Sequence, residues 1–160
     1  MARRVFFSFN YEEDVWRANQ VRNCWMTQPD HQEAGFFDAS LWEKAKQSDE
    51  AIKRMIRDGL QNTTVTAILV GANTANRTYI DYEIDQSYQR GNGLLAIYIN
   101  GLNIPGGVTS ARGINPLDTW TWKESGRKFS DHYATYDWAR DDGYKNCGDW
   151  FERAARQAGK

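Results

Sequence analysis

Three short segments of the chain are apolar at almost every position: residues 5–9 (VFFSF), 65–70 (VTAILV) and 94–99 (LLAIYI). Runs of this kind are typical of strands that are covered on both faces, as in a parallel sheet between helices. Residues 35–37 are a very short candidate, and residues 133–138 are a candidate for an edge strand. The pattern therefore predicts five strands.

Between these segments, apolar residues recur at helical spacing. One stripe follows the first strand, where the acidic residues 12–14 suit the positive end of a helix dipole. A second begins at Ser48, a third fills the later part of residues 73–90, and a last helix is expected from Asp149. Residues 40–43 have capping-box spacing and predict a further brief helix. The apolar positions of the four stripes are Val15, Ala18, Val21 and Trp25, then Ile52, Met55, Ile56 and Leu60, then Ile80, Ile84 and Tyr88, and finally Phe151, Ala154, Ala155 and Ala158.

Strands that alternate with helices predict right-handed βαβ crossovers and a parallel sheet. At 160 residues the chain has the size of one domain. We therefore expect residues 1–160 to form a single α/β domain, a flavodoxin-like three-layer sandwich whose central parallel sheet has the strand order 2-1-3-4-5. In that order, segments 5–9 and 65–70 are neighbours at the centre of the sheet.

Residues 101–131 interrupt this alternation. They are rich in Gly, Pro, Asn and Trp and have no hydrophobic period. A loop of this length in a compact domain is usually functional or poorly ordered. We expect the segment to be mostly irregular, without a long helix, and to lie outside the core, with Trp120 and Trp122 folded back over an edge or a cleft.

Charge and composition exclude several classes of function. The net charge is −1 and no basic block is present to grip a phosphate backbone, so nucleic acid is not expected as a partner. The apolar run near the N-terminus is too short for a signal peptide or a membrane span, and no other stretch approaches one. We therefore expect a cytoplasmic protein that does not act at a membrane.

The cysteines and histidines do not form a recognisable site in the sequence. Cys24 and Cys147 lie far apart and make no CxxC pair, and His31 and His132 are isolated. No metal-ligand spacing is present, so no metal is expected. Two unpaired thiols in a reducing compartment account for the cysteines.

The sequence lacks the motifs of several enzyme classes that are built on parallel sheets. No G-x-G-x-x-G follows a strand, no G-x-x-x-x-G-K-[ST] is present, and neither a G-x-S-x-G elbow nor a histidine-based triad can be assembled. Receiver domains need acidic residues where the first and third strands end, whereas the chain has residues 9–11 (FNY) and 70–72 (VGA) there. Flavodoxin-like and TIR-like domains remain.

Residues 79–83 (YIDYE) contain an aromatic residue and a carboxylate four positions apart. On a helix, this spacing brings Tyr79 and Glu83 to one face. An aromatic plate beside a carboxylate suits a substrate with a flat cationic ring attached to a sugar. Taken alone, the motif is weak, because a glutamate on a solvated helix surface also satisfies it.

Several other segments accompany this motif. Residues 4–9 (RVFFSF) precede acidic residues, residues 37–42 (FDASLW) fall where a second strand and its following loop are expected, and residues 136–138 (YDW) and 141–144 (DDGY) come later. Together with residues 79–83, they resemble the TIR-like domains of bacterial Thoeris anti-phage systems, in which a helix after the third strand carries an aromatic residue and a Glu one turn apart. The resemblance covers nearly the whole chain.

The resemblance implies an enzyme that cleaves the nicotinamide–ribose bond of NAD⁺ and cyclises the ADP-ribose, whose product then activates a separate effector protein. It implies Glu83 as the catalytic carboxylate, NAD⁺ as a substrate with no other cofactor, and self-association that completes the pocket through the segment after Phe37. The chain has Tyr79 where the family usually has Trp, and Ile80 replaces a frequent Cys. The mode of ring stacking and the product isomer therefore stay open.

Substrate-binding residues are expected around the catalytic carboxylate. Phe9 and Asn10 end the first strand, at the carboxyl edge where open α/β sheets bind ligands, although a core Phe and a turn Asn fit the same pattern. Asp38 and Trp42 are expected to contact the nucleotide, with packing as the alternative role of Trp42. Tyr79 is expected to face the substrate ring.

A single carboxylate is sufficient for this reaction. Ordinary glycosidases use two, one of which protonates the leaving group. In NAD⁺ the nicotinamide ring is a pyridinium and departs as a neutral molecule, so no acid is needed to protonate it. Glu83 would stabilise the oxocarbenium-like transition state. Two other functions stay open on the sequence: a non-catalytic TIR adaptor, and a plain NAD⁺ glycohydrolase that releases linear ADP-ribose.

Overall fold

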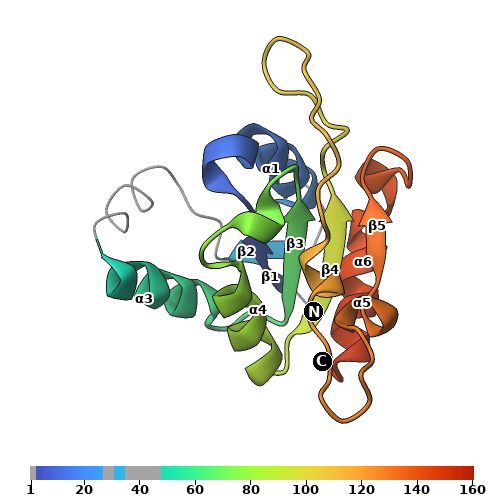
Figure 1. Ribbon diagram of the computed structural model, residues 1–160. Helices are drawn as coiled ribbons and strands as arrows, with labels where there is room; N and C mark the ends of the chain where they lie inside the picture. Colours follow the sequence, from blue (N-terminus) through green and yellow to red (C-terminus); the bar gives the residue numbers. More distant parts are fainter. Residues whose placement is uncertain (1–2, 27–30, 35–47) are drawn as a thin grey trace.

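The described part of the chain, residues 3–26, 31–34 and 48–160 of a computed structural model, is built around a parallel sheet of five strands (Figure 1). The strands are β1 (Arg3–Ser8), β2 (His31–Ala34), β3 (Val65–Val70), β4 (Gly93–Tyr98) and β5 (Thr135–Asp137). Their order is β2-β1-β3-β4-β5, and every neighbouring pair is parallel. The predicted fold class and strand order are therefore confirmed, with β1 beside β3.

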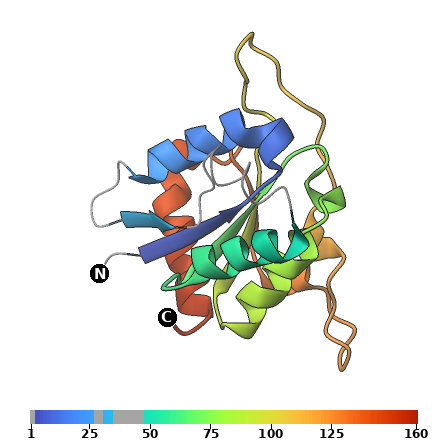
Figure 2. The same ribbon diagram turned by 90° about the vertical axis from the view of Figure 1, so that its left-hand side faces the viewer.

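Helices cover both faces of the sheet and complete the three layers (Figure 2). α1 (Tyr11–Met26) and α6 (Gly143–Gln157) pack on one face, and α3 (Asp49–Leu60) and α4 (Ile80–Gln89) lie on the other. Within the described connections lie three short helices: η1 (Thr74–Asn76), η2 (Pro116–Asp118) and α5 (Phe129–His132). None of the helices in the described residues combines the length and apolar character that crossing a bilayer requires.

The central strands are apolar on both sides because helices cover both sides. In β1, Val5 and Phe7 belong to the cluster with α1 and α6, whereas Phe6 packs against α3. All residues of β3 are buried, including Thr66, whose hydroxyl lies 2.7 Å from the hydroxyl of Ser87 on α4. Thr66 and Ser87, two polar residues buried at this interface, are thus paired between strand and helix, as most buried polar groups are.

The second strand differs from its prediction. It is predicted at residues 35–37, but β2 is formed by His31–Ala34, with Arg3 of β1 opposite His31 and Phe6 opposite Ala34. An edge strand pairs on one side through its backbone and needs no long apolar run, which is why the hydrophobic pattern missed it. Residues 35–37 and the brief helix expected at residues 40–43 lie outside the described residues.

The last helix begins earlier than predicted, at Gly143 rather than Asp149. Asp142 has a left-handed backbone (φ 53°), which ends the turn after β5. Gly143 lies against Trp138, and a Cβ at this position would come within 2.2 Å of the indole ring. A glycine therefore allows α6 to start directly on the Trp138 ring, and this contact leaves no mark in the helical spacing.

Residues 101–131 are mostly irregular, as predicted, but they do not all lie outside the core. Leu117 is fully buried and Phe129 is 3% exposed, both in the cluster formed by β3, β4 and α4. Trp120 and Trp122 fold back onto this cluster, and the Trp122 ring stacks on Phe129 with centroids 4.4 Å apart. Single anchoring side chains fill the core here, so the absence of a period was a poor guide to burial.

Cys24 and Cys147 are isolated in the sequence but are neighbours in the fold. Their Sγ atoms lie 3.8 Å apart, one on α1 and the other on α6, and no disulfide joins them. Burial, with the nearby Cys24 thiol, raises the pKa of Cys147 to about 12. Cys147 is therefore protonated at neutral pH and behaves as a small core residue.

Candidate active site

Glu83 lies on the inner face of α4, over the carboxyl end of β1. Its side chain is fully buried, and the hydroxyl of Ser8, the last residue of β1, donates a hydrogen bond to its Oε2 atom. Because side chains alternate along a strand, Ser8 shares the α4 side of the sheet with Phe6. The carboxylate is thus held at the edge of the sheet where open α/β folds bind ligands.

Arg77 supplies the opposite charge. Its Nη2 atom forms an ion pair with Oε1 of Glu83, and its Nη1 atom donates to the backbone carbonyl of Phe9 at 2.7 Å. The Arg77 side chain is 10% exposed, so the pair is shielded from solvent. Each oxygen of Glu83 therefore has a partner from a different segment: β1 for Oε2, and the turn before α4 for Oε1.

A cavity of about 290 Å³ lies beside this ion pair. Its walls come from the β1–α1 junction, the first turn of α3 and the turn before α4. The lining residues are Asn10, Glu12, Ile52, Asn76, Arg77, Thr78 and Tyr79. Among the described residues, Arg77 lines the cavity and Glu83 does not, so Arg77 contacts both the cavity and the carboxylate.

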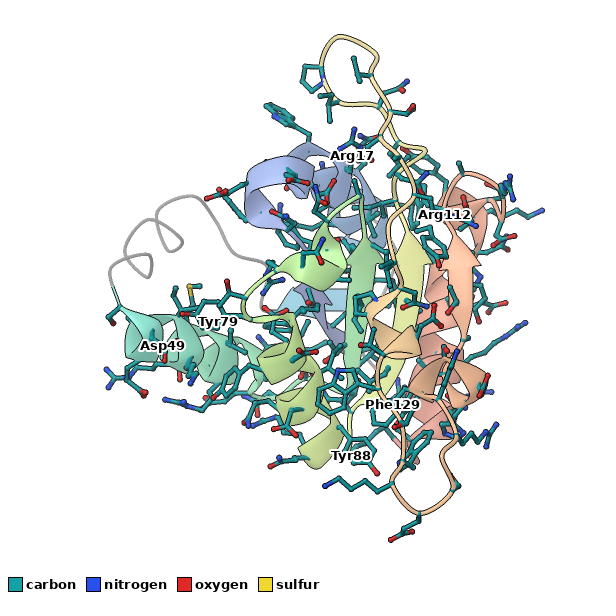
Figure 3. The ribbon with its side chains drawn as sticks, viewed as in Figure 1. Arg17, Asp49, Tyr79, Tyr88, Arg112 and Phe129 are labelled. Atoms are coloured by element: carbon teal, nitrogen blue, oxygen red, sulfur yellow. The ribbon has the colours of Figure 1, made fainter. Side chains whose placement is uncertain are left out.

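Tyr79 joins the start of α4 to the start of α3. Its hydroxyl donates to Asp49 at 2.7 Å, and the two side chains lie next to each other in Figure 3. This hydrogen bond to a carboxylate raises the pKa of the Tyr79 hydroxyl. The Tyr79 ring packs against the cluster of Phe6 and α3. One wall of the cavity is therefore fixed by a contact between two helices.

Four of the residues predicted for the site meet in this region. Glu83 and Tyr79 come from α4 and its N-cap, and Phe9 and Asn10 follow β1. Phe9 is 3% exposed and its ring belongs to the core beside α1, so its contact with the site is the backbone carbonyl. Asn10 lines the cavity. Two further predicted residues lie outside the described part of the chain: Asp38 and Trp42.

Tyr79 and Glu83, the two residues of the predicted motif, have different surroundings in the structure. Tyr79 is the N-cap residue of α4 rather than part of its first turn, and its ring contacts α3, whereas Glu83 contacts β1 and Arg77. The ring is therefore not among the groups that hold the carboxylate. Glu83 is buried, with Ser8 and Arg77 as partners of its two oxygens, and does not lie on the solvated helix surface that was the alternative explanation of the motif.

Ser8 and Arg77 were not among the residues predicted for the site. Ser8 is the single polar position in the apolar run 5–9, and a lone polar side chain in a buried strand needs a partner, which was the available signal. Arg77 lies six positions before Glu83, which is not a spacing that brings two side chains together on a helix. Their pairing depends on the bend between η1 and α4.

Comparison with known proteins identifies the family. Residues 6–104 match the family described as Thoeris protein ThsB, TIR-like domain. This match covers more than half of the chain. The chain belongs to the ThsB TIR-like family. A protein of Bacillus cereus (strain MSX-D12) named "Putative cyclic ADP-D-ribose synthase ThsB1" is 38% identical over 190 aligned positions, which cover 94% of this chain and 99% of the relative.

In this member of the ThsB TIR-like family, the described site falls inside the matched region. Ser8, Arg77, Glu83 and the residues that line the cavity all lie within residues 6–104. The family resemblance seen in the sequence is thereby confirmed. Within the described ranges, no cluster of three or more His, Cys, Asp or Glu side chains is arranged to hold a metal ion.

Proposed function

We propose that this ThsB TIR-like chain cleaves the nicotinamide–ribose bond of NAD⁺ and cyclises the remaining ADP-ribose into a nucleotide signal. The observation that carries the proposal is the buried Glu83 carboxylate at the carboxyl edge of β1, next to a cavity. The name of the Bacillus cereus relative, a cyclic ADP-D-ribose synthase, supports the same chemistry. NAD⁺ is then the substrate, and the reaction needs no other cofactor.

In the proposed first step, Glu83 places negative charge where positive charge develops. When the bond between the nicotinamide nitrogen and the anomeric carbon breaks, the electron pair leaves with nicotinamide, which departs neutral. The ribose then becomes oxocarbenium-like. A carboxylate that is already fixed by its surroundings stabilises this charge without reorganising, and such preorganised electrostatics is often the largest contribution to catalysis.

In the proposed second step, a hydroxyl or ring nitrogen of the same molecule attacks the anomeric carbon. This attack prevails over hydrolysis when the two ends of the nucleotide are held close and water is kept away. We propose that Asn10 and Tyr79, which line the cavity, contact the substrate. Asp38 and Trp42 are proposed as further nucleotide contacts.

The cyclic product is proposed to act as a diffusible signal in anti-phage defence. The family takes its description from the Thoeris system, which supports this role. In the proposed scheme a separate effector protein binds the nucleotide, and the two proteins communicate through the product.

The test is to incubate the purified protein with NAD⁺, with and without extract from phage-infected cells, and to resolve the products by chromatography and mass spectrometry. We expect nicotinamide and, in equal amount, a nucleotide that is one water lighter than linear ADP-ribose. Linear ADP-ribose as the sole nucleotide would favour a glycohydrolase. Absence of nicotinamide release under both conditions would favour an adaptor. Glu83→Gln in the same extract controls for other NAD⁺-consuming enzymes.

We expect activity to depend on self-association. The described cavity of about 290 Å³ is at the lower limit of small-molecule sites, which range from about 300 to 1,000 Å³. A dinucleotide is larger than this cavity and needs additional residues around it. We propose that the segment after Phe37 of a second copy, a segment that lies outside the described residues, supplies them. Specific activity should therefore rise with protein concentration, in step with the mass measured by sedimentation. Constant specific activity together with a monomeric mass over a wide concentration range would contradict this expectation.

A further inference from the structure

We propose that Arg77 holds Glu83 away from the substrate until the diphosphate of the dinucleotide binds Arg77. We call Arg77 in this role a latch. The Arg77 guanidinium exchanges its carboxylate partner for the diphosphate in the cavity, and the exchange frees Glu83 to meet the ribose. This inference rests on the proposed function and goes further, because it names the group of the substrate that opens the site.

The first observation concerns access. Glu83 is fully buried and is not among the described residues that line the cavity, so one of its two neighbours, Ser8 or Arg77, must move before the carboxylate can contact a sugar. Ser8 belongs to β1, whose backbone is held in register with β3. Arg77 lies between η1 and α4, at the end of a long side chain that already borders the cavity. Of these two partners, Arg77 is the one that can move.

The second observation concerns unused hydrogen-bonding capacity. A guanidinium carries five N–H donors, and Arg77 directs one nitrogen at Glu83 and another at the Phe9 carbonyl. Its Nε atom is buried, and among the described residues it has no hydrogen-bond partner. A buried donor without a partner is unfavourable. Arg77 is therefore incompletely satisfied where it lies, and an additional acceptor in the cavity would stabilise it.

The third observation concerns charge. Among the described residues that line the cavity, Arg77 carries the one positive charge and Glu12 the one negative charge. The diphosphate is the anionic part of a dinucleotide, and arginine binds phosphate oxygens through two parallel N–H bonds. After the exchange, Arg77 is paired with the diphosphate and Glu83 with the developing cation. Neither Arg77 nor Glu83 is then left without a counter-charge at the transition state.

The latch makes the site selective for nucleotides with a diphosphate. Adenosine and nicotinamide riboside carry no group that competes with Glu83 for the guanidinium, so they leave the ion pair closed. A structural role for Arg77, in which it supports Glu83 and never releases it, predicts no such selectivity. The two roles therefore differ in a binding measurement that requires no turnover.

The experiment measures the affinities of ADP and adenosine by isothermal titration calorimetry for the full chain and its variants. In the wild type, ADP should bind more tightly than adenosine by about tenfold or more. Arg77→Gln should remove this preference, and Arg77→Lys should keep part of it. Glu83→Gln should strengthen ADP binding above the wild type, because it removes the anion that competes for Arg77. Adenosine affinity should stay the same throughout.

Two further variants guard the result. Arg77→Gln leaves Glu83 buried without its partner and can impair folding. The double variant Arg77→Gln with Glu83→Gln avoids this problem because it removes both charges, and it should also show no preference for ADP. Arg57→Gln on α3 is the matched control, because Arg57 pairs with Glu50 and Tyr82 outside the cavity. Equal affinities for ADP and adenosine in the wild type, or ADP affinity that is the same in all variants, would overturn the latch. Failure of the proposed function is seen separately, as absent NAD⁺ cleavage by the wild type.

Discussion

Glu83→Gln is expected to lower the rate of NAD⁺ consumption by about 10²–10³-fold, the usual effect of removing one preorganised electrostatic contact. Glutamine has nearly the same shape, and its carbonyl oxygen can still accept the hydrogen bond of Ser8. What it lacks is the charge that faces the oxocarbenium-like ribose. For a site with one carboxylate the loss can exceed this range, because no second group takes over the role. The measurement is NAD⁺ consumption at saturating substrate, with phage-infected extract supplied where the wild type needs it.

The buried position of Glu83 changes what the variant does to stability. A carboxylate in an open cleft would contribute little to folding, whereas this one neutralises Arg77. Removing one partner of a buried ion pair costs about 3–5 kcal/mol, and because Arg77 borders the cavity the cost here should lie at or below that range. The rates of the variants must therefore be compared at equal folded fraction, which is measured by circular dichroism.

Asp81 and Asp85 on the same helix provide matched controls for Glu83→Gln, because replacing either by Asn also changes a carboxylate into an amide. Asp85 accepts a hydrogen bond from Gln89 on the surface, and Asp81 accepts one from the indole of Trp120. An asparagine keeps an acceptor oxygen in both places, so Asp81→Asn and Asp85→Asn should leave turnover nearly unchanged. Wild-type turnover in Glu83→Gln would show that the catalytic assignment is wrong and would move the adaptor function ahead.

The sheet could be predicted from the sequence because its central strands are covered on both sides. Burial on both faces demands apolar residues at nearly every position, and β3 coincides with the predicted run 65–70. The edge strand β2 meets no such demand and was placed a few residues away. The start of α6 depends on how closely Gly143 approaches Trp138, which is a contact between two elements and has no periodicity.

The candidate site could be predicted only in part, because some of its features are local in the sequence and others depend on the fold. Glu83 was predicted because the chain resembles a family in which an aromatic residue and a carboxylate lie one helical turn apart, and this spacing is a local pattern. Its partners Ser8 and Arg77 come from other segments and meet it through the packing of α4 on β1. The Cys24–Cys147 contact between α1 and α6 was missed in the same way. Local spacing indicates which residue is chemically suited to a role, whereas the fold decides which groups surround it.

A second buried ion pair holds the loop that follows β4. Arg17 on α1 is 4% exposed, and its Nε atom donates to the carbonyl of Leu102 at 2.9 Å, while Nη2 reaches the carbonyl of Val108 at 3.3 Å. Its Nη1 atom pairs with Oδ1 of Asp14 at 3.1 Å. Arg17 thus lies where α1 meets the base of the extended loop (Figure 3). Asp14 is 1% exposed, and among the described residues its Oδ2 has no hydrogen-bond partner.

Arg17→Met is expected to lower the free energy of unfolding by about 3–5 kcal/mol, because it leaves the Asp14 carboxylate buried without a counter-charge and releases two loop carbonyls. Burial raises the pKa of Asp14, and the hydrogen bond and charge of Arg17 oppose that rise, so the pKa should rise further in the variant. When folding raises the pKa of an acid, that acid contributes stability at pH values below its ordinary pKa, which is 3.8 for Asp. The contribution is lost as the pH rises through the pKa of the folded state. The deficit of the variant should therefore be largest at neutral pH and shrink as the pH falls.

Urea denaturation of the wild type and Arg17→Met at several pH values measures this effect. Arg153→Met is the control, because its ion pair with Asp149 spans 4.0 Å between side chains that are 72% and 74% exposed, and such surface pairs contribute about 0–1 kcal/mol. Adding Asp14→Asn to Arg17→Met removes the stranded charge and should recover part of the lost stability at neutral pH. If Arg17→Met costs no more than Arg153→Met, or if its deficit does not change with pH, then Arg17 does not neutralise a buried carboxylate and the loop is held by other contacts.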